Sequence, residues 1–329
     1  MRTALHRRIA PLAALALTGL LVTTGCGADA AAADNDGYTL RIGAIGNANK
    51  LSGPVGWLHE RGELVPALAE AGVGDVSVVT FPNGPDLNQA LAAGELDLAV
   101  YGDTPALVAR GANQPTRLIA QASVNLDAGI VTKASDGPTS IADLAGRKLA
   151  VQTGSYIHRY LLGALADANV EPAEILHVYA SEVEAALERG DVDAAAVPAA
   201  NVEFLRARGY PVLTVASADH RQYLGTSATV VTENFLDARP EIVPAWQRVQ
   251  RSAAEQAAND WEGFLDYTIS INGFPPEVVR ATTLPEQWPT EAFTEEGLEL
   301  LHGTKEFLTD QEFLRDDFEL DEWIAPGAR

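Results

Sequence analysis

Cysteine is almost absent from this chain: Cys26 is the only one among 329 residues. A lone thiol excludes an intrachain disulfide and any metal site built from several cysteines. The six histidines stand singly, and neither a G-x-S-x-G elbow nor a phosphate-binding P-loop pattern is present. We therefore predict no catalytic residue, no metal site and no cofactor, and expect the protein not to be an enzyme.

Basic residues are also scarce, with 23 Lys and Arg against 45 Asp and Glu and a formal net charge of −22 at pH 7. Nucleic acid is excluded as a partner, because phosphate contacts require a basic surface. The same charge offers no long-range attraction for an anionic ligand. Any bound anion would have to be held by local dipoles, and the many carboxylates are interpreted as a solvated surface.

Long apolar runs are missing too, apart from one near the N-terminus. Three arginines precede an apolar run over residues 9–22, and small residues follow it up to Cys26. This order is typical of a secretory signal, and the run is shorter than the roughly 20 residues that a membrane-spanning helix needs. We predict a signal peptide over residues 1–25 and a flexible tether over residues 26–37.

The end of this segment resembles a bacterial lipobox. A cysteine directly after Gly25 implies that Cys26 receives a lipid and becomes the first residue of the mature chain. Thr23 departs from the pattern, which usually has leucine or valine there. A plain signal peptide and an uncleaved anchor are the alternatives.

The stretch over residues 81–110 carries the clearest functional signal. An amphipathic pattern precedes an apolar strand-like run at 98–101, and then come Gly102, Asp103, Thr104 and a proline. Thr104 before proline predicts a helix N-cap, and such a turn exposes N–H groups that favour an anion. Gly102 and Thr104 are candidate ligand residues. Asp103 carries the wrong charge for an anion, so we expect it to face the backbone or a basic ligand group.

The same stretch resembles the substrate-binding proteins of ABC importers for aliphatic sulfonates, taurine and nitrate. These carry F-x-x-G-P-x-L-x-x-A-L-x-x-G-x-x-D-x-x-x-x-G-D-T-P in the first lobe. The likeness covers roughly residues 38–323 and includes S-I-A-D-L-x-G at 140–146 and A-L-E-R-G-x-V-D-A at 186–194. It implies an α/β, two-lobed fold of the periplasmic-binding-protein type II, in which each lobe is a mostly parallel sheet flanked by helices.

The order of the predicted elements agrees with this layout. Strands alternate with helices up to Val231, and only helical patterns follow, which favours parallel sheets and a middle lobe inserted into the first. We predict lobe 1 at 38–126 and 228–329 and lobe 2 at 127–227. The two lobes are expected to close on a ligand about the two chain crossings.

Three loops have the placement of a ligand site, beyond the carboxyl ends of strands. The first, residues 44–56, is interpreted as a glycine-rich loop, in which Asn47 is a candidate amide donor; the second is the turn at 102–104. The third is another turn into a helix. Two helix N-termini facing each other across a cleft would hold a small oxyanion by N–H and O–H donors. The candidates from the third turn and its helix are Thr153, Gly154, Ser155 and His158.

Each of these candidates has a plainer interpretation. The hydroxyls of Thr104 and Ser155 have the alternative of serving only as helix caps, and His158 that of a half-exposed helical residue. The relatives that bind sulfonates often have a tryptophan after the G-x-V-D-A strand, whereas this chain has Pro198 nearby. Trp57 and Tyr156 are the candidates to replace that aromatic wall, and the identity of the ligand stays open.

The resemblance implies an extracytoplasmic solute-binding lipoprotein of an ABC import system. It would be a monomer, anchored by lipid to the outer face of the cytoplasmic membrane, that delivers an aliphatic sulfonate, taurine or a nitrate-like anion to a permease. The alternatives are an enzyme of the same bilobal fold, a binding protein for a thiamin-pyrimidine precursor, and a signalling or adhesion lipoprotein without import.

Overall fold

The computed structural model describes residues 37–46 and 48–329. The predicted signal peptide, the tether with Cys26, and Asn47 therefore lie outside the described residues. Within the part of the chain that is described, no helix has both the length and the hydropathy that a membrane span requires.

The first sheet has the strand order β2-β1-β3-β10-β4. Strands β1 and β2 pair in parallel, β1 and β3 pair in parallel, and β10 runs antiparallel to both of its neighbours. The central strands are buried on both faces, which explains why their apolar runs are continuous rather than alternating. The strands are β1 (Tyr38–Ile45), β2 (Val73–Phe81), β3 (Leu98–Gly102), β4 (Thr116–Ala120) and β10 (Ser227–Thr232).

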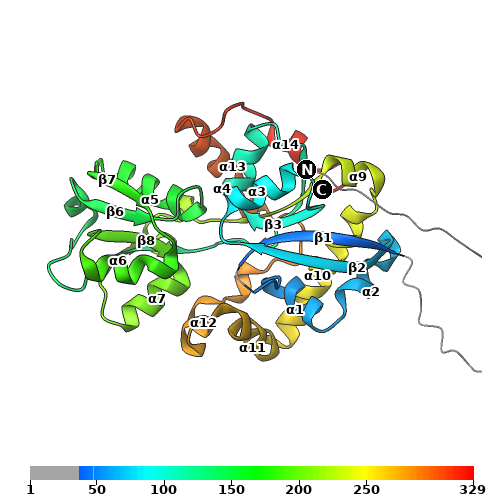
Figure 1. The fold of residues 1–329 in the computed structure, drawn as a ribbon, viewed down its shortest axis with the longest axis horizontal. Helices are drawn as coiled ribbons and strands as arrows, with labels where there is room; N and C mark the ends of the chain where they lie inside the picture. The colour runs from blue at the N-terminus through cyan, green and yellow to red at the C-terminus, as the bar shows by residue number, and fades with distance from the viewer. Residues whose placement is uncertain (1–36, 47) are drawn as a thin grey trace, which may run out of the picture. The chain divides into compact units, whose positions relative to one another are not determined.

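The second sheet repeats this plan with the order β7-β6-β8-β5-β9. Here β5 is the antiparallel strand, and β6 pairs in parallel with β7 and β8. Four of five strands in each sheet thus share one direction, so the prediction of two mostly parallel sheets flanked by helices is confirmed (Figure 1). The strands are β5 (Ala128–Thr132), β6 (Lys148–Val151), β7 (Glu174–His177), β8 (Ala194–Pro198) and β9 (Val212–Val215).

The chain passes between the sheets twice, once after β4 and once before β10. Leu126 on the outward passage and Gly225 on the return passage exchange two backbone hydrogen bonds, of 2.8 and 2.9 Å. The predicted lobe boundaries at 126/127 and 227/228 stay a prediction.

Fourteen α-helices and several short 3₁₀ turns cover the sheets in the described part of the chain. In the first half these helices are α1 (Gly53–Glu60), α2 (Leu64–Leu68), α3 (Gly84–Ala92), α4 (Asp103–Gly111), α5 (Tyr156–Asp167), α6 (Val183–Arg189) and α7 (Ala199–Ala207). They continue with α8 (Ala216–Asp219), α9 (Glu233–Ala238), α10 (Ile242–Asn259), α11 (Trp261–Asn272), α12 (Pro276–Thr282), α13 (Glu295–Asp310) and α14 (Leu320–Trp323). Helix α1 corrects the prediction of a loop over 44–56.

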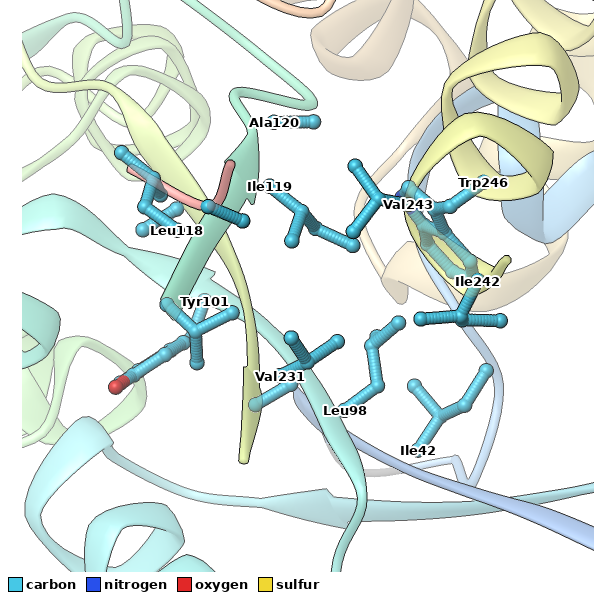
Figure 2. Close-up of a cluster of buried hydrophobic side chains, with 14 of the residues drawn as sticks. Ile42, Leu98, Tyr101, Leu118, Ile119, Ala120, Val231, Ile242, Val243 and Trp246 are labelled. Carbon is cyan, nitrogen blue, oxygen red and sulfur yellow. The ribbon is translucent and has the colours of Figure 1, made fainter. Parts of the chain in front are cut away.

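The largest core lies between the first sheet and α10. Figure 2 shows Trp246 and Val243 of α10 directed toward side chains of the sheet such as Ile119 and Leu98, and all four are at most 2% exposed. Burying such side chains contributes about 1.5–3 kcal/mol each. This core fixes the strand ends from which the site is built.

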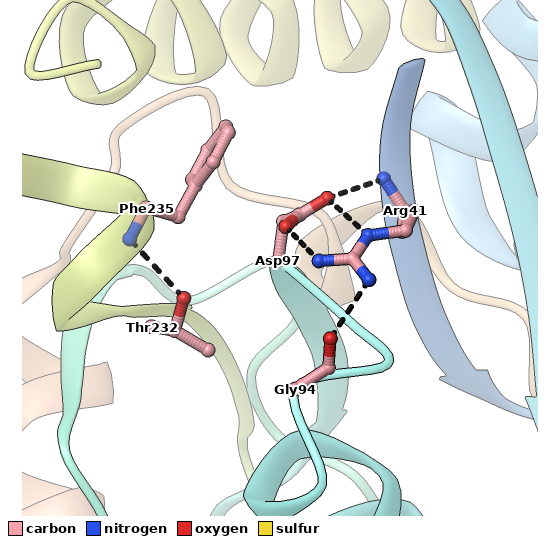
Figure 3. A network of polar contacts seen from close by, with 5 residues as sticks. All are labelled: Arg41, Gly94, Asp97, Thr232 and Phe235. Atoms are coloured by element: carbon pink, nitrogen blue, oxygen red, sulfur yellow. Dashed lines mark hydrogen bonds and ion pairs between the residues drawn. The ribbon is translucent and has the colours of Figure 1, made fainter. Parts of the chain in front are cut away.

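One residue of the sequence motif, Asp97, holds two strands together rather than a ligand. Its carboxylate accepts the backbone N–H of Arg41 at 2.9 Å and two guanidinium N–H groups at 3.0 and 2.6 Å, while Arg41 also donates to the carbonyl of Gly94 at 2.7 Å (Figure 3). Burial alone raises the pKa of Asp97, but its hydrogen bonds with Arg41 and Tyr38 outweigh burial and lower the pKa below its ordinary value.

Candidate functional site

A cleft of about 770 Å³ lies at the carboxyl ends of strands from both sheets. Ile45 at the end of β1 and Pro82 after β2 line it from the first sheet, and Gln152 after β6 and Pro198 at the end of β8 line it from the second. Crevices at this edge are where α/β proteins bind ligands, and this volume lies within the range of small-molecule pockets. The other lining residues are Gly46, Ala48, Lys50, Ser52, Tyr179, Ala180, Ser181, Glu184, Ala200, Asn201, Phe204, Leu205, Ile271, Asn272, Gly273 and Phe274.

Two sets of contacts join the opposite sides of the cleft. Near α3, the Asn83 amide donates to the Tyr179 hydroxyl at 3.1 Å, and the Gln152 amide donates to the Pro82 carbonyl at 3.1 Å. Near α12, the rings of Phe204 and Phe274 meet edge to face with centroids 5.7 Å apart. These contacts bound the cleft.

A second, small cavity of about 20 Å³ adjoins the start of α1. Ser52 lines both this cavity and the large cleft, and its side chain does not cap α1. Trp246, Trp288 and Gln250 also line this cavity. The indole N–H groups of the two tryptophans and the Oε1 atom of Gln250 are buried without a hydrogen-bond partner in the described part of the chain.

Asp103 and Thr104 of the turn at 102–104 are buried rather than exposed, and the role of this turn in ligand binding stays a prediction. Helix α4 begins at Asp103 with Gly102 as N-cap, so the prediction that Thr104 is the N-cap is wrong. The hydroxyl of Thr104 donates to the Asp103 carboxylate, which also accepts the Thr104 N–H, so this hydroxyl does not cap the helix. Asp103 also accepts from Thr226 and Thr304. Asp103 and Thr104 are 0% and 3% exposed, respectively, which agrees with the expectation that Asp103 faces the backbone.

The turn at 153–155 is also satisfied within the protein. Ser155 is the N-cap of α5, which is the plainer of its two interpretations: its hydroxyl accepts the N–H of His158 at 3.3 Å and donates to the Gln152 carbonyl at 2.6 Å. The hydroxyl of Thr153 lies 2.6 Å from His177 Nδ1, and the Gly154 N–H donates to His158 Nδ1 at 3.4 Å. Burial, with a smaller effect of the neighbouring His177, lowers the pKa of His158 below its ordinary value.

None of the described residues predicted to bind the ligand lines the cleft or the small cavity. The segment that was predicted as a loop over 44–56 does line the large cleft, through Gly46, Lys50 and Ser52. The sequence Ser52-Gly53-Pro54 is typical of a helix start and could have indicated this residue. Phe204 and Phe274, which sequence reasoning missed, had no local signal.

The proposed replacements for the missing aromatic wall lie elsewhere. Trp57 is 6% exposed and packs against Phe264 with ring centroids 6.1 Å apart. Tyr156 lies against Gly225 and donates its hydroxyl to the Asp127 carbonyl at 3.2 Å. Neither ring lines the cleft.

The charges of the cleft are balanced by neighbours. Lys50 pairs with Glu60 at 2.8 Å, and Glu184 pairs with Arg208. Among the described residues, no group of three or more His, Cys, Asp or Glu is placed to hold a metal ion. The site therefore offers hydroxyl, amide and backbone donors and an apolar wall, a set suited to binding a small solute.

Two sheets of this topology, joined by two crossings and bordering a shared cleft, define the periplasmic-binding-protein fold. The alkanesulfonate-binding protein SsuA from Xanthomonas axonopodis pv. citri, bound to MOPS, matches with a TM-score of 0.71 at 21% identity, over 87% of this chain and 98% of that one. The aliphatic sulphonate-binding protein SsuA from Escherichia coli matches with a TM-score of 0.68 at 21% identity, over 87% and 92%. The desulfurization enzyme DSZB shares the fold, with a TM-score of 0.67 at 20% identity over 88% and 97%.

The family is shown by sequence. The NMT1/THI5-like family profile matches residues 68–262, more than half of the chain, and the chain belongs to this family. The taurine-binding periplasmic protein of Escherichia coli K12 is 29% identical over 247 residues, which are 70% of this chain and 76% of that protein. Another protein of that strain is named as an aliphatic sulfonates-binding protein. It is 34% identical over 125 residues, which are 37% of this chain and only 39% of that protein.

Proposed function

We propose that this protein is the solute-binding component of an ABC importer and carries a small oxyanionic solute to its permease. The observation that supports this most directly is the cleft at the strand ends of both sheets, which is lined by donors and apolar groups. The names of its relatives, which bind taurine or aliphatic sulfonates, point to a sulfonate.

The charged end of the solute is proposed to lie near Ser52. The Ser52 hydroxyl does not cap α1, the positive end of the α1 dipole lies beside it, and Lys50, which is paired with Glu60, is the cation of the cleft lining. A sulfonate has only acceptor oxygens, so it needs donors of this kind. Thr104, Ser155 and their neighbours stay candidates, but each would have to give up a present hydrogen bond to contact a ligand.

A thermal-shift and calorimetric screen of the full chain tests the function. The panel is nitrate, sulfate, taurine, alkanesulfonates, a sulfate ester and a thiamin-pyrimidine precursor. A true ligand at about 100 times its Kd stabilises the folded state by about 2.7 kcal/mol. Ser52→Ala should weaken its binding, whereas no response to any oxyanion would overturn the proposal.

Export and anchoring are part of the same proposal. We propose that residues 1–25 direct export and that Cys26 carries a lipid on the outer face of the cytoplasmic membrane. Cys26→Ser should release the protein or leave an unprocessed precursor, as judged by cell fractionation and mass. A processed Cys26→Ser protein that stays in the membrane fraction would contradict the lipid anchor.

A further inference from the structure

Phe274 is a large side chain that the described core does not use. It follows Gly273, whose φ of +74° ends α11 and turns the chain toward α12. Phe274 belongs to none of the four hydrophobic core clusters of the described residues. It is half-buried and lines the cleft.

The ring that meets Phe274 comes from the other side of the cleft. Phe204 lies on α7, between strands of the second sheet, whereas Phe274 lies on the chain that follows the first sheet. Their centroids are 5.7 Å apart with an interplanar angle of 62°, a preferred edge-to-face geometry for aromatic pairs. Phe204 is partly buried and also packs against a hydrophobic core of the second sheet, and this packing holds its ring in position.

Apolar side chains line the cleft together with polar ones such as Asn201 and Asn272, and the Arg208 guanidinium lies 5.4 Å from the centroid of the Phe204 ring. Ile45, Pro82, Leu205 and Ile271 line the cleft together with the two rings. Its acidic residue, Glu184, is already paired with Arg208, so it leaves no free carboxylate for an ammonium group. A volume of about 770 Å³ exceeds what a two-carbon sulfonate fills.

Resting on the proposed function, we propose that the cleft selects oxyanions with a bulky aromatic or long alkyl body, and that Phe204 and Phe274 are the specificity-determining walls of that body. The two rings take the place of the aromatic wall that is missing after residue 194. With the charged end near Ser52, the apolar body extends toward the rings. A two-carbon solute such as taurine has no bulky apolar body to place against the rings.

The test measures the binding of a series of sulfonates to the full chain in detergent. Binding is measured by calorimetry and, for 2-naphthalenesulfonate, also by its fluorescence. The series is ethanesulfonate, taurine, hexanesulfonate, benzenesulfonate and 2-naphthalenesulfonate. We expect wild type to bind 2-naphthalenesulfonate at least tenfold more tightly than ethanesulfonate, with a blue-shifted emission. Phe274→Ala should lose at least tenfold of the naphthyl affinity and change ethanesulfonate affinity less than threefold.

Two further variants control for folding and for aromatic character. Phe204→Leu keeps the apolar volume behind the wall and should still lower the preference for aromatic over hexyl bodies. Leu284→Ala removes a side chain that is 40% exposed and outside the cleft lining, and should bind the whole series like wild type.

The outcomes separate the inference from the function it rests on. Equal affinity of wild type for ethanesulfonate and 2-naphthalenesulfonate would overturn the inference and leave the receptor function standing. Equal losses for all sulfonates in Phe274→Ala would also overturn it, because the ring would then act only through folding. No binding of any sulfonate by wild type would overturn the sulfonate assignment and the inference with it.

Discussion

Replacing Asp103 by asparagine removes one buried charge without changing the shape of the side chain. In the native protein Oδ2 accepts the N–H of Thr226 at 2.9 Å and the hydroxyls of Thr226 and Thr304 at 3.2 Å each. Oδ1 accepts the N–H and the hydroxyl of Thr104. The carboxylate thus joins α4, the chain just before β10, and α13.

The expected loss of stability follows from the hydrogen-bond donors that an asparagine at this position cannot satisfy. In its better orientation the amide oxygen takes the Oδ2 position, and its NH₂ group then faces the Thr104 N–H. A buried donor left without an acceptor costs about 1–3 kcal/mol, and hydrogen bonds to a neutral acceptor are worth about 0.5–1.5 instead of about 1.5–3 kcal/mol. The lower desolvation cost of a neutral amide offsets part of this loss. We expect Asp103→Asn to destabilise the protein by about 2–4 kcal/mol.

Urea unfolding followed by far-UV circular dichroism measures this change as a lower midpoint. Glu255→Gln, at an exposed position of α10, is the matched control and should stay within about 0.5 kcal/mol of wild type. Where both proteins are folded, sulfonate affinity should be unchanged within about threefold, because Asp103 does not line the cleft. Wild-type stability together with a more than tenfold loss of affinity would refute this reasoning and restore Asp103 as a ligand residue.

Two other predictions concern the Arg41–Asp97 pair and the cap of α5. Because the folded-state pKa of Asp97 is lowered, its contribution to stability is present above the unfolded-state value of about 3.9 and is lost as the pH falls through the folded-state value. Asp97→Asn should therefore lower the free energy of unfolding at pH 7 and make its loss below pH 4 less steep in acid titrations. An acid profile identical to that of wild type would contradict this. Ser155→Ala should cost about 1 kcal/mol through the lost cap, measured by urea unfolding against Ser155→Thr, which keeps the hydroxyl.

Strong local signals allowed much of the fold to be predicted. The apolar residues of α5 recur with helical spacing and a glycine follows α6, so both helices carry a local sequence signal; that glycine, Gly190, has the left-handed φ of +72° that a helix end favours. Helix α1 was missed because Gly53 and Gly56 lower its intrinsic helix propensity, although Ser52 before Gly53 and Pro54 is a helix-start signal. Packing of α1 against α10 and α11 overrides that propensity, and this packing has no local sequence signal.

The candidate site was harder to predict, because a hydroxyl at the start of a helix has the same sequence signal whether it caps the helix or contacts a ligand. Ser52, Thr104 and Ser155 all precede or begin helices. The structure separates them by their partners: Ser155 caps α5, Thr104 is buried against Asp103, and Ser52 is exposed, does not cap α1 and lines the cleft. A hydroxyl that its own helix does not use is the one with a donor left for a solute. The same reasoning applies to aromatic side chains, since Trp57 packs in a hydrophobic core, whereas Phe274 lines the cleft. In this fold, the residues that folding leaves unused are the ones to substitute first when the ligand is sought.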